Sequence, residues 1–313
     1  MTGMGNSLAS GARRNPLRAL LKSPHRYWLL AILLISATHY AWGAITPPWG
    51  DQKVSFVPAD KVCGADGALR YCVYRDQRGT NGDIVYHLHG RNLDEQIWND
   101  DTYFTALVQQ QWQQGKALPP TVVTLSYGKT WLLTPRGEKP DSGLLDDMMA
   151  RLPAIEAKIG VPHRRLLMGE SMGGLNVLVA GLSYPSKFSK IASLCPGVYA
   201  FSPFGPRSDI QAAMVRTGAD PKIAMGAWLM ANQYLANDGE WQRVSPLSLI
   251  ERAGPRYPAL YLSNGLYDAY GNYEGTERLA VVGRRHGVKI EWHPLYGGHC
   301  AIDTSSLAAF LIS

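Results

Sequence analysis

The chain alternates between short apolar runs and longer segments in which apolar residues recur every three or four positions. Several short runs are apolar at almost every position, as in Val-Val-Thr-Leu, Leu-Leu-Met and Ala-Leu-Tyr-Leu. Such runs are typical of strands buried on both faces. We predict strands at residues 70–75, 84–89, 121–127, 165–168, 190–195, 259–264 and 288–293.

Segments with helical spacing separate these runs. The clearest is 142–159, where apolar side chains follow the 3.6-residue period and Gly160 supplies a stop. Further helices are predicted at 102–114, 176–184, 272–286 and 301–312. Strands that alternate with helices predict an α/β fold, with a mostly parallel central sheet and helices on both faces.

One interval, between Cys195 and Ala259, shows no strand pattern. It is too apolar for a free linker, since it contains Phe201, Phe204, Met214, Met225, Trp228, Met230, Tyr234 and Trp241. Two interpretations stay open. The segment could form helices that only pack on the sheet, or a cap at about 200–250 that shapes a substrate pocket. We favour a mixture of the two.

The charge of the chain is concentrated near its start. The net charge is +6, but residues 1–43 hold five basic residues and no acidic one. Without them, 26 basic residues face 25 acidic ones. The remainder has no cationic excess that would direct it to phosphate backbones, so the composition excludes a nucleic-acid partner.

Residues 1–43 have the organisation of a signal peptide. Basic residues end at Arg26, an apolar run follows over 27–37, and small residues stand at Ala41 and Gly43. The run is about a dozen residues, shorter than the roughly 20 that span a bilayer. We expect cleavage, which leaves a catalytic domain at 44–313, periplasmic or secreted. The alternative is an uncleaved N-terminal anchor, the one case in which a membrane span is expected.

The four cysteines suit an oxidising compartment. Cys63 and Cys72 flank a turn-like insert between two strand-like runs, so we expect a disulfide across a hairpin. Cys195 and Cys300 would then form the second pair, although sequence alone leaves the connectivity open. No spacing of Cys or His indicates a metal site.

The strongest motif is Gly169-Glu170-Ser171-Met172-Gly173-Gly174, between a predicted strand and a predicted helix. A Gly-x-Ser-x-Gly sequence in this context is typical of a nucleophile elbow. It holds the serine in a strained turn with its hydroxyl projecting. Side chains at the flanking positions would collide with the neighbouring strand and helix, so Gly169 and Gly173 are required.

A serine hydroxyl needs a base and an acid that orients the base. In a nucleophile-elbow fold the acid follows the serine in the chain, and the histidine base follows the acid. Asp268 lies just after the strand at 259–264, and His299 follows Gly297-Gly298. We therefore predict the triad Ser171, Asp268 and His299. The rival bases are His286, expected at the surface, and His293, expected to be structural. The rival acids are Glu274 and Asp303.

Two backbone N–H groups are needed to stabilise an oxyanion. Met172 supplies one, and Arg91 supplies the other in a turn that Gly90 permits, after the strand at 84–89. Residues expected to bind or position the substrate are His89, Glu170, Lys129 and Trp131. Lys129 and Trp131 stand in a loop that is equally well interpreted as ordinary surface.

These motifs, with Trp241, Ser245-Pro246-Leu247 and the helix around Glu156, resemble the esterase D-like family of α/β hydrolases. That family includes feruloyl and acetylxylan esterases, S-formylglutathione hydrolases, enterochelin esterases and bacterial mycolyltransferases. The resemblance implies an α/β-hydrolase fold with a helical insertion after the sixth strand. It also implies ester hydrolysis through an acyl-enzyme, without a cofactor.

The predicted export favours a serine carboxylesterase that acts on a small-molecule or carbohydrate ester, such as an acyl- or feruloyl-carbohydrate. It disfavours S-formylglutathione hydrolysis, because that reaction takes place in the cytoplasm. An acyltransferase of the mycolyltransferase type would use the same triad. A non-catalytic binding protein is disfavoured because all three triad positions are filled. A prolyl-oligopeptidase-type enzyme would need a large additional domain. The oligomeric state is left open.

Overall fold

The computed structural model describes residues 25–45, 53–115, 117–131, 134, 139 and 142–313. The chain divides into two compact units, Met1–Gln52 and Lys53–Ser313. The described part of the first unit is helix α2 (His25–Ile45), which contains the apolar run of the expected leader. Among the described helices, none combines the length and the apolar character needed to cross a bilayer. Residues 1–24 lie outside the described residues, so cleavage of the leader stays a prediction.

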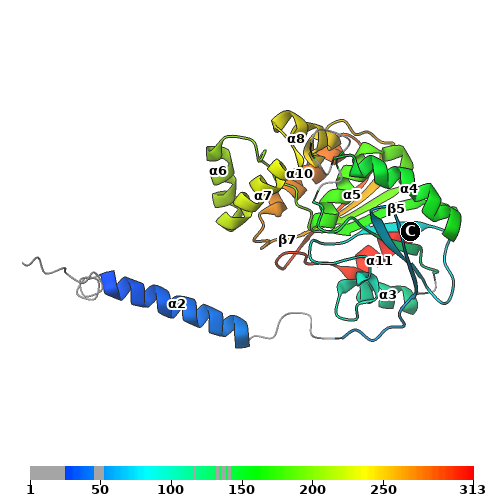
Figure 1. Cartoon of the computed structure of the whole chain (residues 1–313), viewed down its shortest axis with the longest axis horizontal. Coiled ribbons are helices and arrows are strands. Elements are labelled where there is room, and N and C mark those ends of the chain that lie inside the picture. The colour runs from blue at the N-terminus through cyan, green and yellow to red at the C-terminus, as the bar shows by residue number, and fades with distance from the viewer. Residues whose placement is uncertain (1–24, 46–52, 116, 132–133, 135–138, 140–141) are drawn as a thin grey trace, which may run out of the picture. The chain divides into compact units, whose positions relative to one another are not determined.

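The second unit is built on one eight-stranded sheet (Figure 1). In their order across the sheet, the strands are β1 (Asp60–Asp66), β2 (Leu69–Arg75), β4 (Thr121–Ser126), β3 (Ile84–Leu88), β5 (Arg165–Glu170), β6 (Lys190–Leu194), β7 (Ala259–Gly265) and β8 (Ile290–Leu295). β2 pairs antiparallel with both β1 and β4, and every pair from β4 to β8 is parallel. This arrangement confirms the predicted α/β-hydrolase fold.

The inner strands explain the continuous apolar runs. β3, β4 and β6 are buried at every position, because helices cover both faces of the sheet. All the predicted strands are present, with ends that differ by a few residues. β8, for example, runs to Leu295 rather than to His293.

The edge strand β1 runs further than expected, because the sequence indicated a strand-like run only up to Cys63. The segment after Cys63 was expected to be a turn-like insert, but most of it is paired strand, and only Gly67 and Ala68 form the turn. β1 is exposed along most of its length, which removes the hydrophobic alternation that marks a strand. Cys63 lies directly opposite Cys72, and the two form the expected hairpin disulfide.

Helices form a layer on each face of the sheet. Their bounds are α3 (Phe104–Gln114), α4 (Leu144–Ile159), α5 (Met172–Ser183), α10 (Asn272–Arg285) and α11 (Thr304–Ile312), with short 3₁₀ turns η1 (Ile97–Asn99) and η2 (Pro185–Lys187). One apolar core lies between the sheet and α4, α5 and α10, and a second lies under α3 and α11 (Figure 1). Trp112 of α3 donates its indole N–H to the Ala308 carbonyl of α11, at 3.1 Å, and thereby ties the second layer together.

The interval between β6 and β7 contains no strand, as the sequence predicts, and most of it is helical. It forms α6 (Arg207–Thr217), α7 (Pro221–Tyr234), α8 (Asp238–Val244) and α9 (Pro246–Ile250). Its apolar residues divide into two groups. Trp241 and Tyr234 are buried in the core, whereas Met225, Trp228 and Leu229 of α7 are 58%, 45% and 55% exposed. Packing on the sheet accounts for the first group only.

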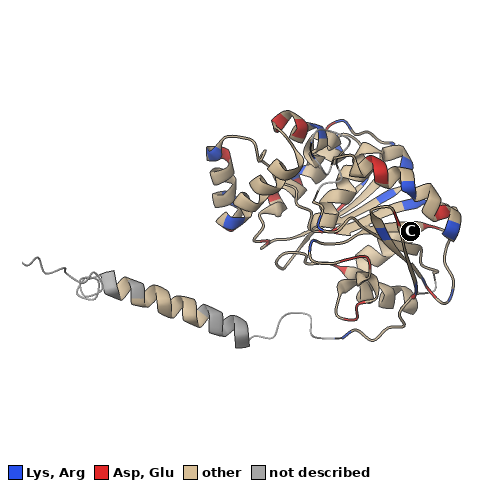
Figure 2. Cartoon of the chain, viewed as in Figure 1, with Lys and Arg blue, Asp and Glu red and all other residues tan. Residues whose placement is uncertain are grey.

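Charged side chains of the second unit are mixed. Figure 2 shows Lys and Arg interspersed with Asp and Glu over the same helices. This distribution agrees with the nearly balanced charge of the chain beyond its first 43 residues.

Candidate active site

Ser171 occupies the turn between β5 and α5, where it has a φ of 53°. Its N–H donates to the Leu194 carbonyl of β6, at 2.9 Å. A Cβ on Gly173 would collide with the Leu88 carbonyl of β3, and one on Gly169 would collide with the Gly173 carbonyl. The steric reason for the two glycines is therefore confirmed, and the serine is held in a strained conformation at the carboxyl end of the sheet.

The structure brings the three predicted triad side chains together. His299 Nε2 lies 3.0 Å from Ser171 Oγ, and His299 Nδ1 lies 2.9 Å from Asp268 Oδ2. The Asp268 side chain is fully buried. A carboxylate in that position favours the tautomer that carries its proton on Nδ1, which leaves Nε2 free to accept the serine proton.

Asp268 and His299 have supports that the sequence did not indicate. Asp268 Oδ1 accepts the Tyr270 N–H at 2.8 Å. With its amide oriented so that both of its polar atoms are satisfied, Asn264 donates to Asp268 Oδ2 at 2.9 Å. The Tyr270 ring packs on the His299 ring with centroids 4.1 Å apart. The first two contacts hold the Asp268 carboxylate in place, and the third holds the His299 imidazole.

The loop that carries His299 is tied to the sheet. Cys300 forms a disulfide with Cys195 at the end of β6, which confirms the second expected pair. The loop also passes so close to Gly265 of β7 that a side chain there would meet the Gly298 carbonyl. Among the described residues, the non-glycine residues with positive φ are Ser171, Cys195 and Cys300, so the strained backbone is concentrated at this site.

The rival bases and acids lie elsewhere. His286 is exposed at the end of α10, and His293 stacks on Tyr261 of β7 with centroids 4.3 Å apart. Glu274 pairs with Arg216 at 3.0 Å, and Asp303 caps the start of α11. The surface position of His286 and the structural position of His293 agree with expectation.

Two backbone N–H groups are available to an oxyanion. Met172 is the first residue of α5, and Arg91 lies in the turn after β3. Within the described residues, neither N–H donates a hydrogen bond. The Gly90 N–H donates to Glu170 Oε1 at 2.6 Å, so Gly90 shapes the turn and does not serve as a donor.

Glu170 and His89 lie beneath this turn, at 1% and 3% exposure, rather than on a substrate surface. Glu170 Oε2 lies 2.8 Å from His87 Nε2. His89 Nδ1 donates to the Gly90 carbonyl at 2.8 Å, and its Nε2 lies 2.8 Å from Ser126 Oγ. Burial lowers the pKa of His89, which keeps it neutral and able to make both bonds. No local pattern marks His87 or Ser126, because their partners are distant in the chain.

A cavity of about 390 Å³ has in its wall Tyr270, the residue that packs on His299. Arg91, Trp131, Tyr199 and Tyr270 line it together with one face of α7. The expected contact residue Trp131 therefore faces a cavity. The expected contact residue Lys129 is exposed and does not line this cavity.

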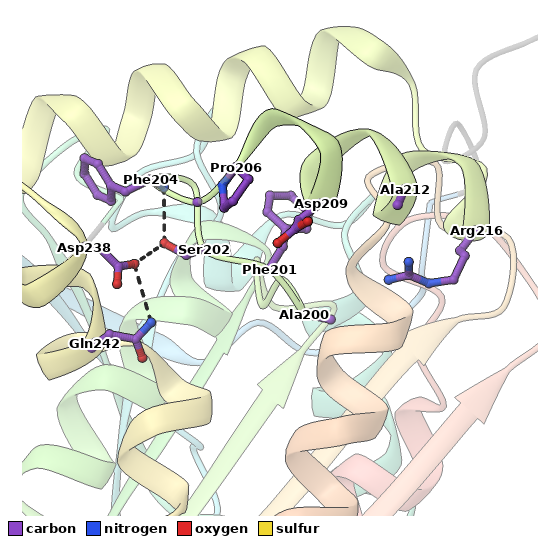
Figure 3. A pocket seen from close by; sticks show the side chains of 11 residues that line it. Ala200, Phe201, Ser202, Phe204, Pro206, Asp209, Ala212, Arg216, Asp238 and Gln242 are labelled. Carbon is purple, nitrogen blue, oxygen red and sulfur yellow. Dashed lines mark hydrogen bonds between the residues drawn. The ribbon is translucent and has the colours of Figure 1, made fainter.

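A second cavity, of about 670 Å³, lies among α6, α8 and the segment before α6 (Figure 3). Asp209 and Asp238 line it, and Asp238 accepts hydrogen bonds from Ser202 and Gln242. Its one lining cation, Arg216, is held by Glu274. The second cavity is therefore lined by carboxylates, whereas the charged residues that line the first are cations.

Within the described residues, the one cluster with metal-ligand atoms close together is Cys195, His299 and Cys300. Its two sulfur atoms are bonded to each other, so they offer no thiolate to an ion.

Comparison with known proteins agrees with this geometry. Residues 69–293 match the family described as "Putative esterase", and the chain belongs to that family. This agrees with the resemblance to esterase D-like proteins, and it makes the chain a carboxylic ester hydrolase. No curated protein matches the sequence.

Solved structures share the fold at low sequence identity. An arylesterase superposes with a TM-score of 0.59 at 16% identity, covering 84% of this chain and 87% of its own. An S-formylglutathione hydrolase from Agrobacterium tumefaciens gives 0.55 at 15%, covering 83% and 95%. A ferulic acid esterase gives 0.54 at 18%, covering 83% and 96%.

Proposed function

We propose that the protein is an exported serine carboxylesterase in which Ser171 is the nucleophile, His299 the general base and Asp268 the orienting acid. The observation that carries the proposal is the position of His299. One ring nitrogen faces the Ser171 hydroxyl and the other faces a buried carboxylate. This arrangement of hydroxyl, imidazole and carboxylate activates a serine hydroxyl at neutral pH.

The reaction follows from these positions. His299 Nε2 takes the proton as Ser171 Oγ attacks the ester carbonyl, and the N–H groups of Met172 and Arg91 receive the developing oxyanion. The imidazolium then gives its proton to the departing alcohol, which leaves an acyl-serine. Water, deprotonated by the same imidazole, attacks the acyl-serine, releases the acid and restores Ser171.

Export and substrate class belong to the proposal. Two disulfides suit an oxidising compartment, and residues 1–43 have the pattern of a signal peptide. We assign 44–313 to the catalytic domain because it follows the predicted leader, and 200–250 to its cap because α7 lines the cavity that contains Tyr270, the neighbour of His299. An extracellular ester, of acyl- or feruloyl-carbohydrate type, fits a cavity walled by aromatic side chains.

Hydrolysis of p-nitrophenyl acetate by the purified protein tests the mechanism. Ser171→Ala should lower kcat by about 10³-fold or more, because the remaining N–H groups cannot replace a nucleophile. Ser186→Ala, which changes an exposed serine of η2, serves as the matched control and should retain the wild-type rate. Equal rates for wild type and Ser171→Ala would remove Ser171 from the mechanism.

A further inference from the structure

The cavity of about 390 Å³ is part of the surroundings of the reacting atoms. Arg91 follows Gly90 in the turn that offers an oxyanion N–H. Tyr270, which also lines the cavity, packs on the imidazole of His299. An ester held by Ser171 and the two N–H groups would therefore extend one of its ends into this cavity.

The charge of the cavity is of one sign. Arg91 and Lys222 line it from two elements far apart in the chain, the turn after β3 and the start of α7. Among the residues that the structure describes, no carboxylate lines it, and neither cation takes part in an ion pair. Apart from the amide of Gln233, the rest of the wall is aromatic or aliphatic and includes Trp131, Tyr199 and Met230.

Nearby carboxylates have other partners. Asp220, two residues before Lys222, accepts the Lys222 backbone N–H at 2.9 Å and caps α7. Asp268 binds His299, and Asp94 accepts the Gln96 N–H at 2.9 Å. Two cations that have no ion-pair partner among the described residues, and that line one cavity together with three aromatic side chains, are arranged to receive an anion.

We propose that the preferred substrates are esters with an anionic group, a carboxylate or phosphate, attached to an aromatic or similarly apolar body. The anion lies between Arg91 and Lys222, and the apolar body lies against Trp131, Tyr199 and Tyr270. The proposal rests on the proposed esterase function and names the substrate class of that same site. The cavity of Figure 3 cannot substitute, because its lining carboxylates repel an anion and its cation is already paired.

Two pairs of activated esters test the proposal and show on which side of the ester the charge lies. The pair 4-acetoxybenzoate and 4-acetoxybenzamide places the charge on the leaving group. The p-nitrophenyl esters of 4-carboxybenzoic and 4-carbamoylbenzoic acid place it on the acyl group. Within each pair, a neutral amide replaces a carboxylate of nearly the same shape. The readout is the ratio of kcat/KM for the anionic ester to that for the neutral one.

We expect the wild-type ratio, in at least one pair, to fall about fivefold in Lys222→Gln and again in Arg91→Gln, the size of an ion pair that is partly exposed to water. It should also fall as ionic strength rises, because salt screens the attraction. Comparison with the wild type cancels any difference in intrinsic reactivity between the two esters.

Lys187→Gln and Arg207→Gln are the matched controls, since they remove the same charges from exposed positions outside the cavity. Both should keep the wild-type ratio. The proposal is overturned if the ratios for both pairs are the same in Lys222→Gln as in the wild type, or if the controls change them equally. Failure of the esterase proposal is distinguishable, because the neutral esters would then be hydrolysed equally by Ser171→Ala.

Discussion

At the scale of single residues, the site is held by side chains that never touch the substrate. Glu170 precedes the nucleophile, but its carboxylate points under the turn after β3, where it accepts the Gly90 N–H and lies against His87. It thus connects the nucleophile elbow to the turn that presents the Arg91 N–H. In the proposed mechanism, Glu170 is therefore a positioning residue, which acts through the two proposed oxyanion donors.

Glu170→Ala should therefore lower kcat about 10- to 100-fold on p-nitrophenyl acetate, with a small change in KM. The reason is that displacing the Arg91 N–H weakens a hydrogen bond that forms mainly in the transition state. Glu170→Gln retains an oxygen that can accept from Gly90 and should recover part of the loss. A purely structural role would instead lower activity and melting temperature together in both variants. Steady-state kinetics at a temperature below both melting transitions separates the two cases.

The triad was predictable from sequence and its supports were not, for a physical reason. Ser171, Asp268 and His299 each follow a strand-like run and stand beside glycines that a tight turn requires, so local patterns mark them. The contacts of Glu170 with Gly90 and of Tyr270 with His299 join residues 80 and 29 positions apart. Only the packing of the sheet brings such residues together.

At the scale of elements, the two disulfides have different roles. Cys63–Cys72 joins neighbouring strands over 9 positions, whereas Cys195–Cys300 closes 105 positions and lies beside His299. Loop-closure entropy predicts a stabilisation of about 2.6 kcal/mol for the first and about 4.8 kcal/mol for the second. Only the second also anchors the loop that carries His299, the proposed general base.

Cys195→Ser/Cys300→Ser should lower both the free energy of unfolding and kcat, because the loop carrying His299 loses its attachment to β6. Cys63→Ser/Cys72→Ser is the matched control and should lower stability by a smaller amount while keeping kcat. Chemical denaturation and kinetics on the same preparations measure both quantities. A loss of kcat that is equal in the two double variants would argue against the anchoring role.

Sequence patterns predict the buried elements but not the exposed edge of the sheet. Strands buried on both faces, such as β4 and β6, are visible as apolar runs, and α4 is visible from its period. β1 is exposed at most positions, so neither pattern marks it, and its pairing with β2 is what defines it. The interval 200–250 shows its helical content but not which helices face the cavity, since buried and exposed apolar residues look alike in sequence.

For the whole molecule, stability against acid depends on particular carboxylates rather than on net charge. Beyond residue 43 the charges nearly balance, and Figure 2 shows them intermixed. Several carboxylates are held ionised by hydrogen bonds or cations. Their pKa values lie below the ordinary value at Asp76, Asp100, Asp147, Glu156 and Asp303. Each binds protons less readily in the folded state than in the unfolded state, so lowering the pH favours unfolding.

Glu156 of α4 is the member of this group that joins the most elements. Its carboxylate accepts from Tyr86 of β3 at 2.6 Å and from Arg165 of β5 at 2.5 and 2.6 Å, and its side chain is 4% exposed. Burial opposes its ionisation, but the hydrogen bonds from Arg165 and Tyr86 outweigh burial and lower its pKa below 4.5. Its stabilisation is therefore complete above pH 4.5 and is lost as the pH falls through the folded-state pKa.

Glu156→Gln should lower the free energy of unfolding by about 1–3 kcal/mol at pH 7, the cost of weakening a buried charged hydrogen-bond set. The difference from wild type should shrink as the pH falls below 4.5, because the wild-type carboxylate becomes protonated and loses its pairing with Arg165. Urea denaturation at a series of pH values measures this, with the exposed Glu251→Gln as control. A difference that stays constant down to pH 3 would mean that Glu156 acts through packing, not through its charge.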